Sequence, residues 1–214
     1  MIDAVIFDAE GVVVVDTEKT WDRAQDEFLS RHGLHYDREK TKHLLSGRSQ
    51  AEAIDVMKAE CGLVGDTQSL IRERLDLVRR HLEEQVDFVP GFCDFYQKIR
   101  PALKTCLATA MPEDLLEIVD ARLGLSKLFA GRIYSLIHVG QRSKPDPDLF
   151  LYAAGRLAAG PENCVVIEDA PHGVEAARRA GMKCIALTTT YDRRKLRQAD
   201  VVVDGFEQID LATL

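Results

Sequence analysis

The sequence predicts an α/β protein whose parallel sheet is interrupted, after its first strand, by a block of helices. Short apolar runs recur along most of the chain and alternate with segments in which apolar residues have helical spacing. Apolar runs of this length are typical of strands that are buried on both faces of a parallel sheet. Residues 17 to about 86 differ, because they contain amphipathic helical patterns and no strand-like run.

Six apolar runs are predicted to be strands, and helical segments connect them. The strands are expected at 4–7, 106–109, 133–136, 164–167, 184–188 and 201–203. Two intervening segments, 112–123 and 148–158, place their apolar residues on one helical face. Strand, helix and strand in repeated succession imply a parallel sheet with right-handed crossovers.

The insert is predicted to contain three helices. Their apolar stripes are Trp21, Ala24, Phe28 and Leu29 in the first, and Ile71, Leu75, Val78 and Leu82 in the third. Residues 49–52 read Ser-Gln-Ala-Glu, a capping-box pattern that begins the second helix. Gly33 and Gly62 are expected to end the first two helices. The predicted domains are therefore residues 1–16 with 87–214, and the helical residues 17–86.

Length and composition are those of an ordinary globular protein. The chain has 214 residues, of which 46% are hydrophobic and 29% charged, so disorder and fibrous folds are disfavoured. Its net charge of -7 argues against a general nucleic-acid or membrane-surface binder. We find neither a signal-peptide pattern nor a run long enough to span a membrane. The five cysteines are scattered without CxxC pairs, so we expect reduced thiols and a cytoplasmic protein.

Reactive side chains follow four of the predicted strands. They are Asp8 and Glu10 after the first strand, Thr109 at the end of the second, Lys144 in the loop after the third, and Glu168 with Asp169 after the fourth. Functional groups of open parallel sheets gather beyond the carboxyl ends of the strands, so we expect these side chains to meet. Carboxylates so close together repel one another unless a cation is present. A hard divalent ion such as Mg²⁺ satisfies them and leaves positions open for a phosphate.

These residues lie in four longer segments, which occur in order along the chain. The segments are VIFDAEGVVVVDTE at 5–18, CLATAMP at 106–112, SKPDPDLF at 143–150 and VVIEDAPHGVEAARRAGM at 165–182. Each resembles one of the four motifs of the haloacid dehalogenase superfamily, specifically its helical-cap phosphatase and β-phosphoglucomutase-like branch. The resemblance covers essentially the whole chain. It implies a Rossmann-like parallel-sheet core with an inserted α-helical cap domain.

The resemblance also implies Mg²⁺-dependent hydrolysis of a small phosphomonoester. Asp8 is expected to attack phosphorus and to form an aspartyl-phosphate, which divides one difficult hydrolysis into two easier steps. The carboxylate of Asp8, the backbone carbonyl of Glu10, and the acids Glu168 and Asp169 are expected to hold the Mg²⁺. The residue at position 10 is expected to protonate the leaving group and then to deprotonate the attacking water.

Contacts to the phosphoryl group and the substrate are expected from other positions. Lys144 would offset the anionic charge, and the Thr109 hydroxyl with the Ala110 amide would hold the transferring oxygens. Arg48 lies at a predicted helix start, where its guanidinium and backbone amides can meet an anionic substrate. An exposed arginine beside a capping serine is an equal alternative. The expected partner is a small phosphorylated metabolite, bound to a monomer or small homo-oligomer.

Two features depart from the first motif. Position 10 is normally aspartate, and Glu10 carries its carboxyl one methylene further out, where a displacement of about 1 Å costs about a hundredfold in rate. Four valines separate Gly11 from Asp16, one residue more than the usual spacing. We hypothesise that this longer loop re-aims Glu10 so that its carboxyl still reaches the site.

Three other functions are carried as alternatives. A phosphomutase would return the phosphoryl group to a rebound sugar, but Trp21 stands where β-phosphoglucomutases generally carry a histidine. We interpret Trp21 as a core anchor of the first inserted helix. A true dehalogenase would leave the Glu168–Asp169 pair without a purpose. A catalytically weak binding protein of the same fold is favoured by Glu10 alone.

Overall fold

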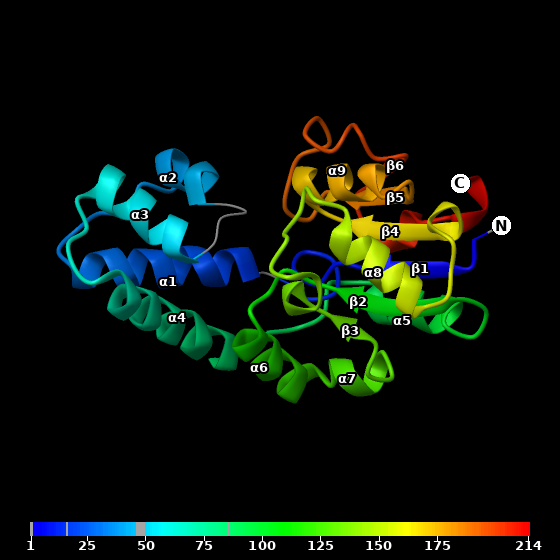
Figure 1. Cartoon of the computed structure of the whole chain (residues 1–214), viewed down its shortest axis with the longest axis horizontal. Coiled ribbons are helices and arrows are strands. Elements are labelled where there is room, and N and C mark those ends of the chain that lie inside the picture. The colour runs from blue at the N-terminus through cyan, green and yellow to red at the C-terminus, as the bar shows by residue number, and fades with distance from the viewer. Residues whose placement is uncertain (1, 16, 46–49, 85) are drawn as a thin grey trace. The chain divides into compact units, whose positions relative to one another are not determined.

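The computed structural model describes residues 2–15, 17–45, 50–84 and 86–214. The chain divides into two compact units, one formed by Met1–Asp16 with Val86–Leu214 and the other by Thr17–Gln85 (Figure 1). We call them the α/β unit and the helical unit. Within the described residues, no helix is both long enough and apolar enough to cross a membrane.

The described part of the α/β unit forms one sheet of six parallel strands. They are β1 (Ala4–Phe7), β2 (Lys104–Ala108), β3 (Ile133–Tyr134), β4 (Cys164–Glu168), β5 (Lys183–Leu187) and β6 (Val201–Val203). Their order is β3-β2-β1-β4-β5-β6, with every neighbouring pair parallel. All six predicted strands are confirmed, and β3 is shorter than predicted. The strand order reverses between β1 and β4, which is the switch point where such sheets bind ligands.

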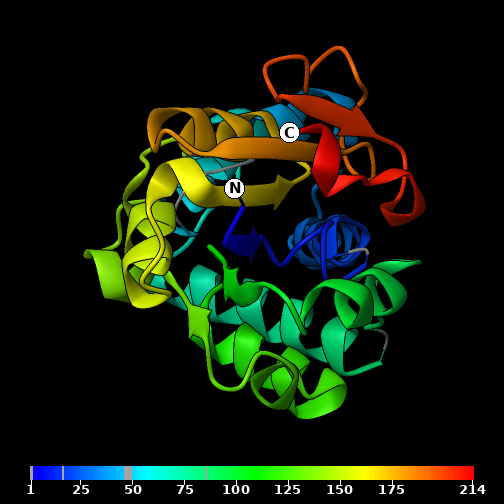
Figure 2. The same cartoon turned by 90° about the vertical axis from the view of Figure 1, so that its right-hand side faces the viewer.

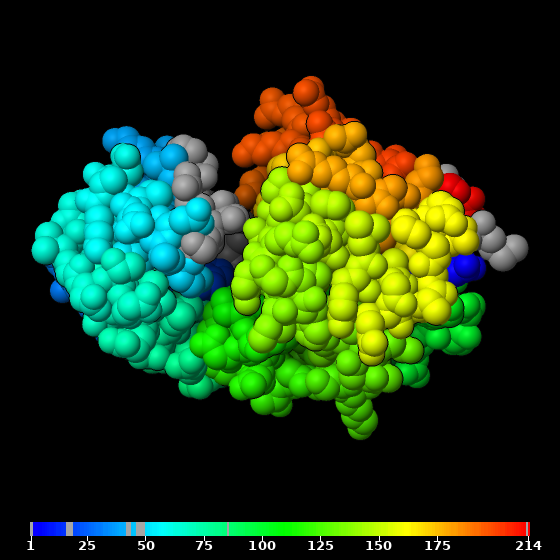
Figure 3. All heavy atoms as spheres, viewed as in Figure 1, coloured from blue at the N-terminus to red at the C-terminus, as the bar shows by residue number. Residues whose placement is uncertain are grey.

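One face of the sheet is covered by two helices that follow β3 and β4. They are α8 (Asp148–Arg156) and α9 (Pro171–Arg179), whose apolar residues pack on alternate strand residues such as Ile6 and Val166. Figure 3 shows the atoms of the α8 segment, in yellow-green and yellow, on the outer surface of the α/β unit. The free thiols of Cys106, Cys164 and Cys184 are buried in the same core.

The opposite face is packed with aromatic rings. Phe7 of β1 lies 5.6 Å from the ring of Phe92 and 5.9 Å from that of Phe129, and Phe92 lies 5.7 Å from Phe206. Edge-to-face pairs of this kind contribute about 0.5–1.5 kcal/mol each beyond the area that they bury. The other helical and 3-10 segments of the α/β unit are α5 (Phe92–Ile99), α6 (Glu113–Leu123), α7 (Leu125–Leu128), η1 (Leu136–Val139), η2 (Pro161–Asn163), η3 (Phe206–Gln208) and η4 (Leu211–Thr213).

Both ends of the chain belong to the α/β unit and lie on the side of the sheet where its strands begin (Figure 1 and Figure 2). The opposite side of the sheet, where the strands end, is formed by the loops that carry the predicted site residues.

The helical unit contains α1 (Thr17–Arg31), α2 (Arg38–Leu45), α3 (Gln50–Cys61) and α4 (Thr67–Glu84). The sequence did not predict α2. Gly33 and Gly62 have positive φ values of 71° and 75° after α1 and α3, as the predicted helix ends require. Ser49 of the predicted capping box lies outside the described residues.

The buried face of α4 differs from the predicted stripe. Leu70, Leu77, Val78 and Leu82 are buried together with Arg74, whereas Ile71 and Leu75 are only half-buried. The Arg74 Nε donates to Gln25 Oε1 at 2.8 Å, and the guanidinium stacks 4.7 Å from the ring centre of Trp21. Burial lowers the pKa of Arg74 to about 10, with Tyr36 opposing the shift. Trp21 is itself half-buried rather than a core anchor.

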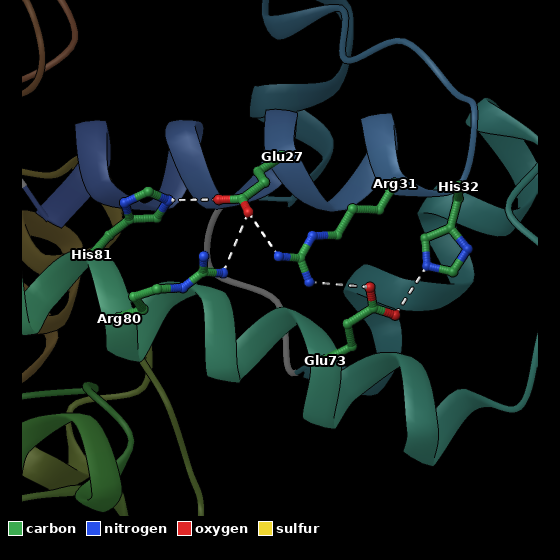
Figure 4. A network of polar contacts seen from close by, with 6 residues as sticks. All are labelled: Glu27, Arg31, His32, Glu73, Arg80 and His81. Carbon is green, nitrogen blue, oxygen red and sulfur yellow. Dashed lines mark hydrogen bonds and ion pairs between the residues drawn. The ribbon is translucent and has the colours of Figure 1, made fainter.

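A surface network of charged side chains links α1 and α4 (Figure 4). Glu27 accepts from Arg31 at 2.8 Å and from Arg80 at 3.3 Å, and it contacts the His81 ring at 3.1 Å. Arg31 also lies 3.9 Å from Glu73 on α4. These side chains are partly exposed, so each pair contributes about 0–1 kcal/mol. The buried apolar faces of the two helices therefore provide most of the stability of this packing.

Candidate active site

Four of the predicted site residues meet beyond the carboxyl ends of β1 and β4. Asp8 follows the last residue of β1, Glu168 ends β4, and Asp169 comes next. Because β1 and β4 are paired neighbours, with Phe7 opposite Ile167, these carboxyls start from adjacent strand ends. Lys144 enters from the loop before α8, and its Nζ donates to Asp8 Oδ1 and, at 2.7 Å, to Glu168 Oε1.

All four of these side chains are buried. Asp8 is 7% exposed, Lys144 6%, Glu168 1% and Asp169 5%. Three acids and one lysine thus share a region from which water is largely excluded. Electrostatic interactions are much stronger there than at the surface.

Glu168 is held by contacts to both of its carboxylate oxygens. Its Oε1 pairs with Lys144, and its Oε2 accepts the backbone N–H groups of Asp169 at 2.8 Å and Ala170 at 2.9 Å. Burial acts to raise the pKa of Glu168, but the positive charge of Lys144 and the nearby His172 outweigh it, and the net shift is downward. Glu168 is therefore a fixed anion, and direct coordination of a metal through Oε1 would have to replace its contact with Lys144.

The Glu168 carboxyl occupies the space that a side chain at Gly173 would need. A Cβ at Gly173, in the first turns of α9, would lie 1.8 Å from Glu168 Oε1. We expect Gly173→Ala to displace this carboxyl and to lower the free energy of unfolding by about 1–3 kcal/mol, the usual cost of overpacking. Thermal and urea unfolding measure the loss.

Gly155→Ala is the matched control for this prediction. Gly155 also lies within a helix, α8, and nothing lies within 4 Å of the Cβ that it would gain. Alanine is about 0.5–1 kcal/mol better than glycine inside a helix, so this variant should be more stable. Equal stability changes in the two variants would contradict the steric role of Gly173.

Asp169 lies against the loop that follows β1. A Cβ on Gly11 would be only 2.0 Å from Asp169 Oδ2, and Gly11 has a φ of +73°, a conformation that favours glycine. Burial, followed by the negative charges of Glu168 and Asp8, raises the pKa of Asp169 well above its ordinary value.

Asp8 has a similar electrostatic environment. Burial raises the pKa of Asp8 to about 7, with Glu168 and Glu10 adding to the rise and Lys144 opposing it. Among the described residues, Lys144 is the basic side chain that forms ion pairs with this cluster. One lysine leaves an excess of negative charge when all three acids are ionised.

The donor set fits a hard divalent cation. Asp8 and Asp169 supply carboxylate oxygens. Burial disfavours the ionised form of both groups, and the one nearby lysine does not provide enough positive charge to offset it. Within the described chain, no three His, Cys, Asp or Glu side chains form a complete metal-binding group. Mg²⁺ does not require one, because it typically takes one or two carboxylates and keeps water or phosphate oxygens in its other positions.

Glu10 lies on a tightly turned loop. The carbonyl of Ala9 accepts the N–H groups of Val12, Val13 and Val14 at 3.3, 2.9 and 2.8 Å, and Glu10 forms an isolated bridge with Val14. The three valines are fully buried. Val12, Val13 and Val14 therefore form a compact turn, and Glu10 is close enough to Asp8 to raise its pKa.

The remaining predicted residues are placed as follows. Thr109 follows β2, is buried, and its Oγ1 accepts the Met111 N–H at 3.0 Å, while Ala110 is exposed. Arg48 lies outside the described residues. His172 was not among the predicted site residues; it is near enough to Glu168 to affect the pKa of that carboxyl, and burial lowers the pKa of His172 itself.

The parallel sheet, its strand order and the buried carboxylate cluster at the switch point define an α/β protein with an inserted helical unit and a candidate active site. The model of the haloacid dehalogenase-like hydrolases matches residues 2–181. The chain therefore belongs to the haloacid dehalogenase-like hydrolase family.

Individual relatives are phosphatases. The chain is 33% identical to fructose-1-phosphate phosphatase YqaB of Escherichia coli (strain K12), over 85% of this chain and 94% of that protein. It is 27% identical to hexitol phosphatase A of the same strain, over 95% and 91%. Among solved structures, CbbY from Rhodobacter sphaeroides in complex with phosphate is similar with a TM-score of 0.82 at 26% identity, covering 100% of this chain and 99% of that one.

Proposed function

We propose that this protein is a Mg²⁺-dependent phosphatase that hydrolyses small phosphorylated sugars or sugar alcohols through an aspartyl-phosphate on Asp8. The observation that carries the proposal is the buried Asp8 carboxylate, held by Lys144 beside Glu168 and Asp169 at the switch point of the sheet. An attacking carboxylate requires a fixed orientation and a nearby positive charge. The relatives named above act on small phosphate esters of this kind.

The first step transfers the phosphoryl group to Asp8. A carboxylate oxygen of Asp8 forms a bond to phosphorus while the bond from phosphorus to the ester oxygen breaks. Glu10 gives its proton to the departing oxygen, which leaves as an alcohol. The Thr109 hydroxyl and the Ala110 amide hold the phosphoryl oxygens, and Lys144 orients Asp8.

The second step releases phosphate. Glu10, now ionised, takes a proton from a water molecule, whose oxygen attacks phosphorus as the bond to Asp8 breaks. Asp8, Asp169 and the backbone carbonyl of Glu10 would hold the Mg²⁺, with Glu168 beside them. When bound, the ion supplies positive charge that keeps Asp8 ionised and offsets the charge on the phosphoryl oxygens.

A panel of phosphate esters tests this function. We expect release of inorganic phosphate from fructose 1-phosphate or a hexitol phosphate in the presence of Mg²⁺, and loss of that activity in excess chelator. Phosphate release that persists fully in chelator would contradict the dependence on Mg²⁺. Ligand binding without turnover of any ester would favour a binding protein, and interconversion of sugar monophosphates with a bisphosphate activator would favour a phosphomutase.

Substitutions at Glu10 test its proposed role in proton transfer. We expect Glu10→Gln to lower kcat by about 10²–10⁴-fold, because an amide cannot transfer the proton. Glu10→Asp is expected to lower kcat as well, because the shorter side chain withdraws the carboxyl from the position that this turn provides. Phosphate release at saturating substrate measures both variants. A large gain of activity in Glu10→Asp would contradict the idea that the valine-rich turn is adapted to glutamate.

A further inference from the structure

Three consecutive threonines follow β5, and two of them contact the proposed site. The Thr189 Oγ1 donates to the backbone carbonyl of Gly11 at 2.6 Å, and the Thr190 hydroxyl lies beside Gly11 near the Asp169 carboxylate, whose pKa it lowers. The strand order β1-β4-β5 places β4 between these threonines and the loop after β1. The segment after β5 therefore extends past the end of β4, which carries Asp169, to reach Gly11.

The two contacts fix different parts of the site. Gly11 directly follows Glu10, and a glycine has no side chain with which to anchor the loop, so its carbonyl provides the attachment. Asp169 is buried, and a hydroxyl donor stabilises a buried carboxylate and limits its rotation. A Cβ on Gly11 would lie 2.0 Å from Asp169 Oδ2 and 2.7 Å from Thr190 Oγ1, so these groups are in close packing contact.

We propose that Thr189 and Thr190 are positioning residues of the phosphatase site. Thr189 fixes the backbone beside Glu10, and Thr190 fixes the carboxylate of Asp169. Together they hold the proton-transferring residue and the cation-binding residue at a constant relative position. The inference rests on the proposed function, because it assigns the two threonines to groups that have roles in that reaction.

Thr188 provides a matched control within the same run. Its Oγ1 donates to Asp204 Oδ1 at 2.7 Å, in the loop after β6. Valine has the shape of threonine without the hydroxyl, so Thr188→Val, Thr189→Val and Thr190→Val each remove one donor from one turn. Thr189→Ser and Thr190→Ser keep the hydroxyl and remove the methyl group.

The two threonines are expected to give different results. Thr190→Val should weaken Mg²⁺ binding, measured by calorimetry without substrate, by about tenfold, the effect of one hydrogen bond to a charged group. Thr189→Val should weaken Mg²⁺ binding less than Thr190→Val does, lower kcat by about fivefold, and speed amide hydrogen exchange in residues 11–14 by a similar factor. Thr188→Val and both serine variants should match the wild type in all three measurements.

Each other outcome contradicts the inference. Wild-type Mg²⁺ affinity in Thr190→Val, or wild-type kcat and exchange in Thr189→Val, would overturn the corresponding assignment. Equal losses in the valine and serine variants would show that methyl packing, not the hydroxyl, is responsible. If the wild type hydrolyses no phosphate ester, the proposed function fails, while Mg²⁺ binding and amide exchange still test the two threonines.

Discussion

Asp8→Asn is expected to abolish phosphate release, with a loss on the order of 10⁶-fold, the size of effect seen when a covalent nucleophile is removed. The amide has nearly the same shape as the carboxylate but cannot form a stable bond to phosphorus. Lys144 keeps Glu168 as an ionic partner at 2.7 Å, so the variant should remain folded. Phosphate release and circular dichroism, measured on the same preparation, separate loss of chemistry from loss of structure.

The covalent intermediate provides a second readout for the same variant. Wild-type protein quenched in acid during turnover should carry a phosphoryl group on the peptide that contains Asp8, and the Asn variant should not. Mass spectrometry of the digested protein detects the difference. A phosphorylated peptide in the variant, or residual activity within about tenfold of the wild type, would assign the nucleophile to another residue.

The parts of the fold that the sequence predicted are those in which burial dominates. All six strands are short apolar runs, and burial on both faces of a parallel sheet leaves little room for another interpretation. The meeting of Asp8, Glu168 and Asp169 was predicted for a related reason. Residues that directly follow adjacent parallel strands lie together at the carboxyl ends of those strands, regardless of the conformation of the connecting loops.

The helical unit was predicted less well because polar residues occupy its interior. The buried face of α4 runs through Leu70, Arg74, Leu77 and Val78, which is regular helical spacing with an arginine in the middle. Sequence reasoning avoids burying an arginine and therefore selects the neighbouring stripe that includes Ile71 and Leu75. The sequence offered no signal for the contacts that Gln25 and Trp21 make with this guanidinium.

Within the site, sequence reasoning did not identify the hydroxyls after β5. Thr189 and Thr190 carry no charge, and threonine at the end of a strand most often serves only the backbone. Their contacts depend on the strand order, which places β5 beside β4. The sequence also did not indicate that Glu168 and Asp169 make different contacts. Successive residues at a strand end point in different directions, and only the structure shows that Glu168 holds Lys144.

Lys144→Met is expected to cause the largest loss of stability among the variants considered. Removing one partner of a buried ion pair costs about 3–5 kcal/mol, because the other charges remain buried without compensation. Here the Lys144 side chain contacts both Asp8 and Glu168 and is almost completely buried. We expect this loss in metal-free protein at neutral pH, measured by thermal and urea unfolding.

Lys183→Met is the corresponding surface control. Lys183 lies 2.9 Å from Asp200, and both side chains are substantially exposed. An exposed pair of this kind contributes about 0.2–1 kcal/mol, so the control should unfold nearly like the wild type. A loss in Lys144→Met no larger than in Lys183→Met would mean that the buried acids are protonated in the folded protein and need no cation.

The pH dependence distinguishes the electrostatic cause from lost packing. Burial raises the pKa of Asp8 to about 7, so between about pH 4 and pH 7 the folded state holds a proton that the unfolded state has released. The free energy of unfolding of metal-free protein should therefore fall as pH rises through this window, by at most about 1.4 kcal/mol per pH unit for this group. Lys144 lowers the pKa of Asp8, so its removal extends the fall to higher pH and makes the variant's deficit smallest in acid. Added Mg²⁺ should reduce the fall in wild-type protein, because binding favours the ionised carboxylates. A deficit in Lys144→Met that stays constant from pH 5 to 8 would instead indicate lost packing of the lysine stem.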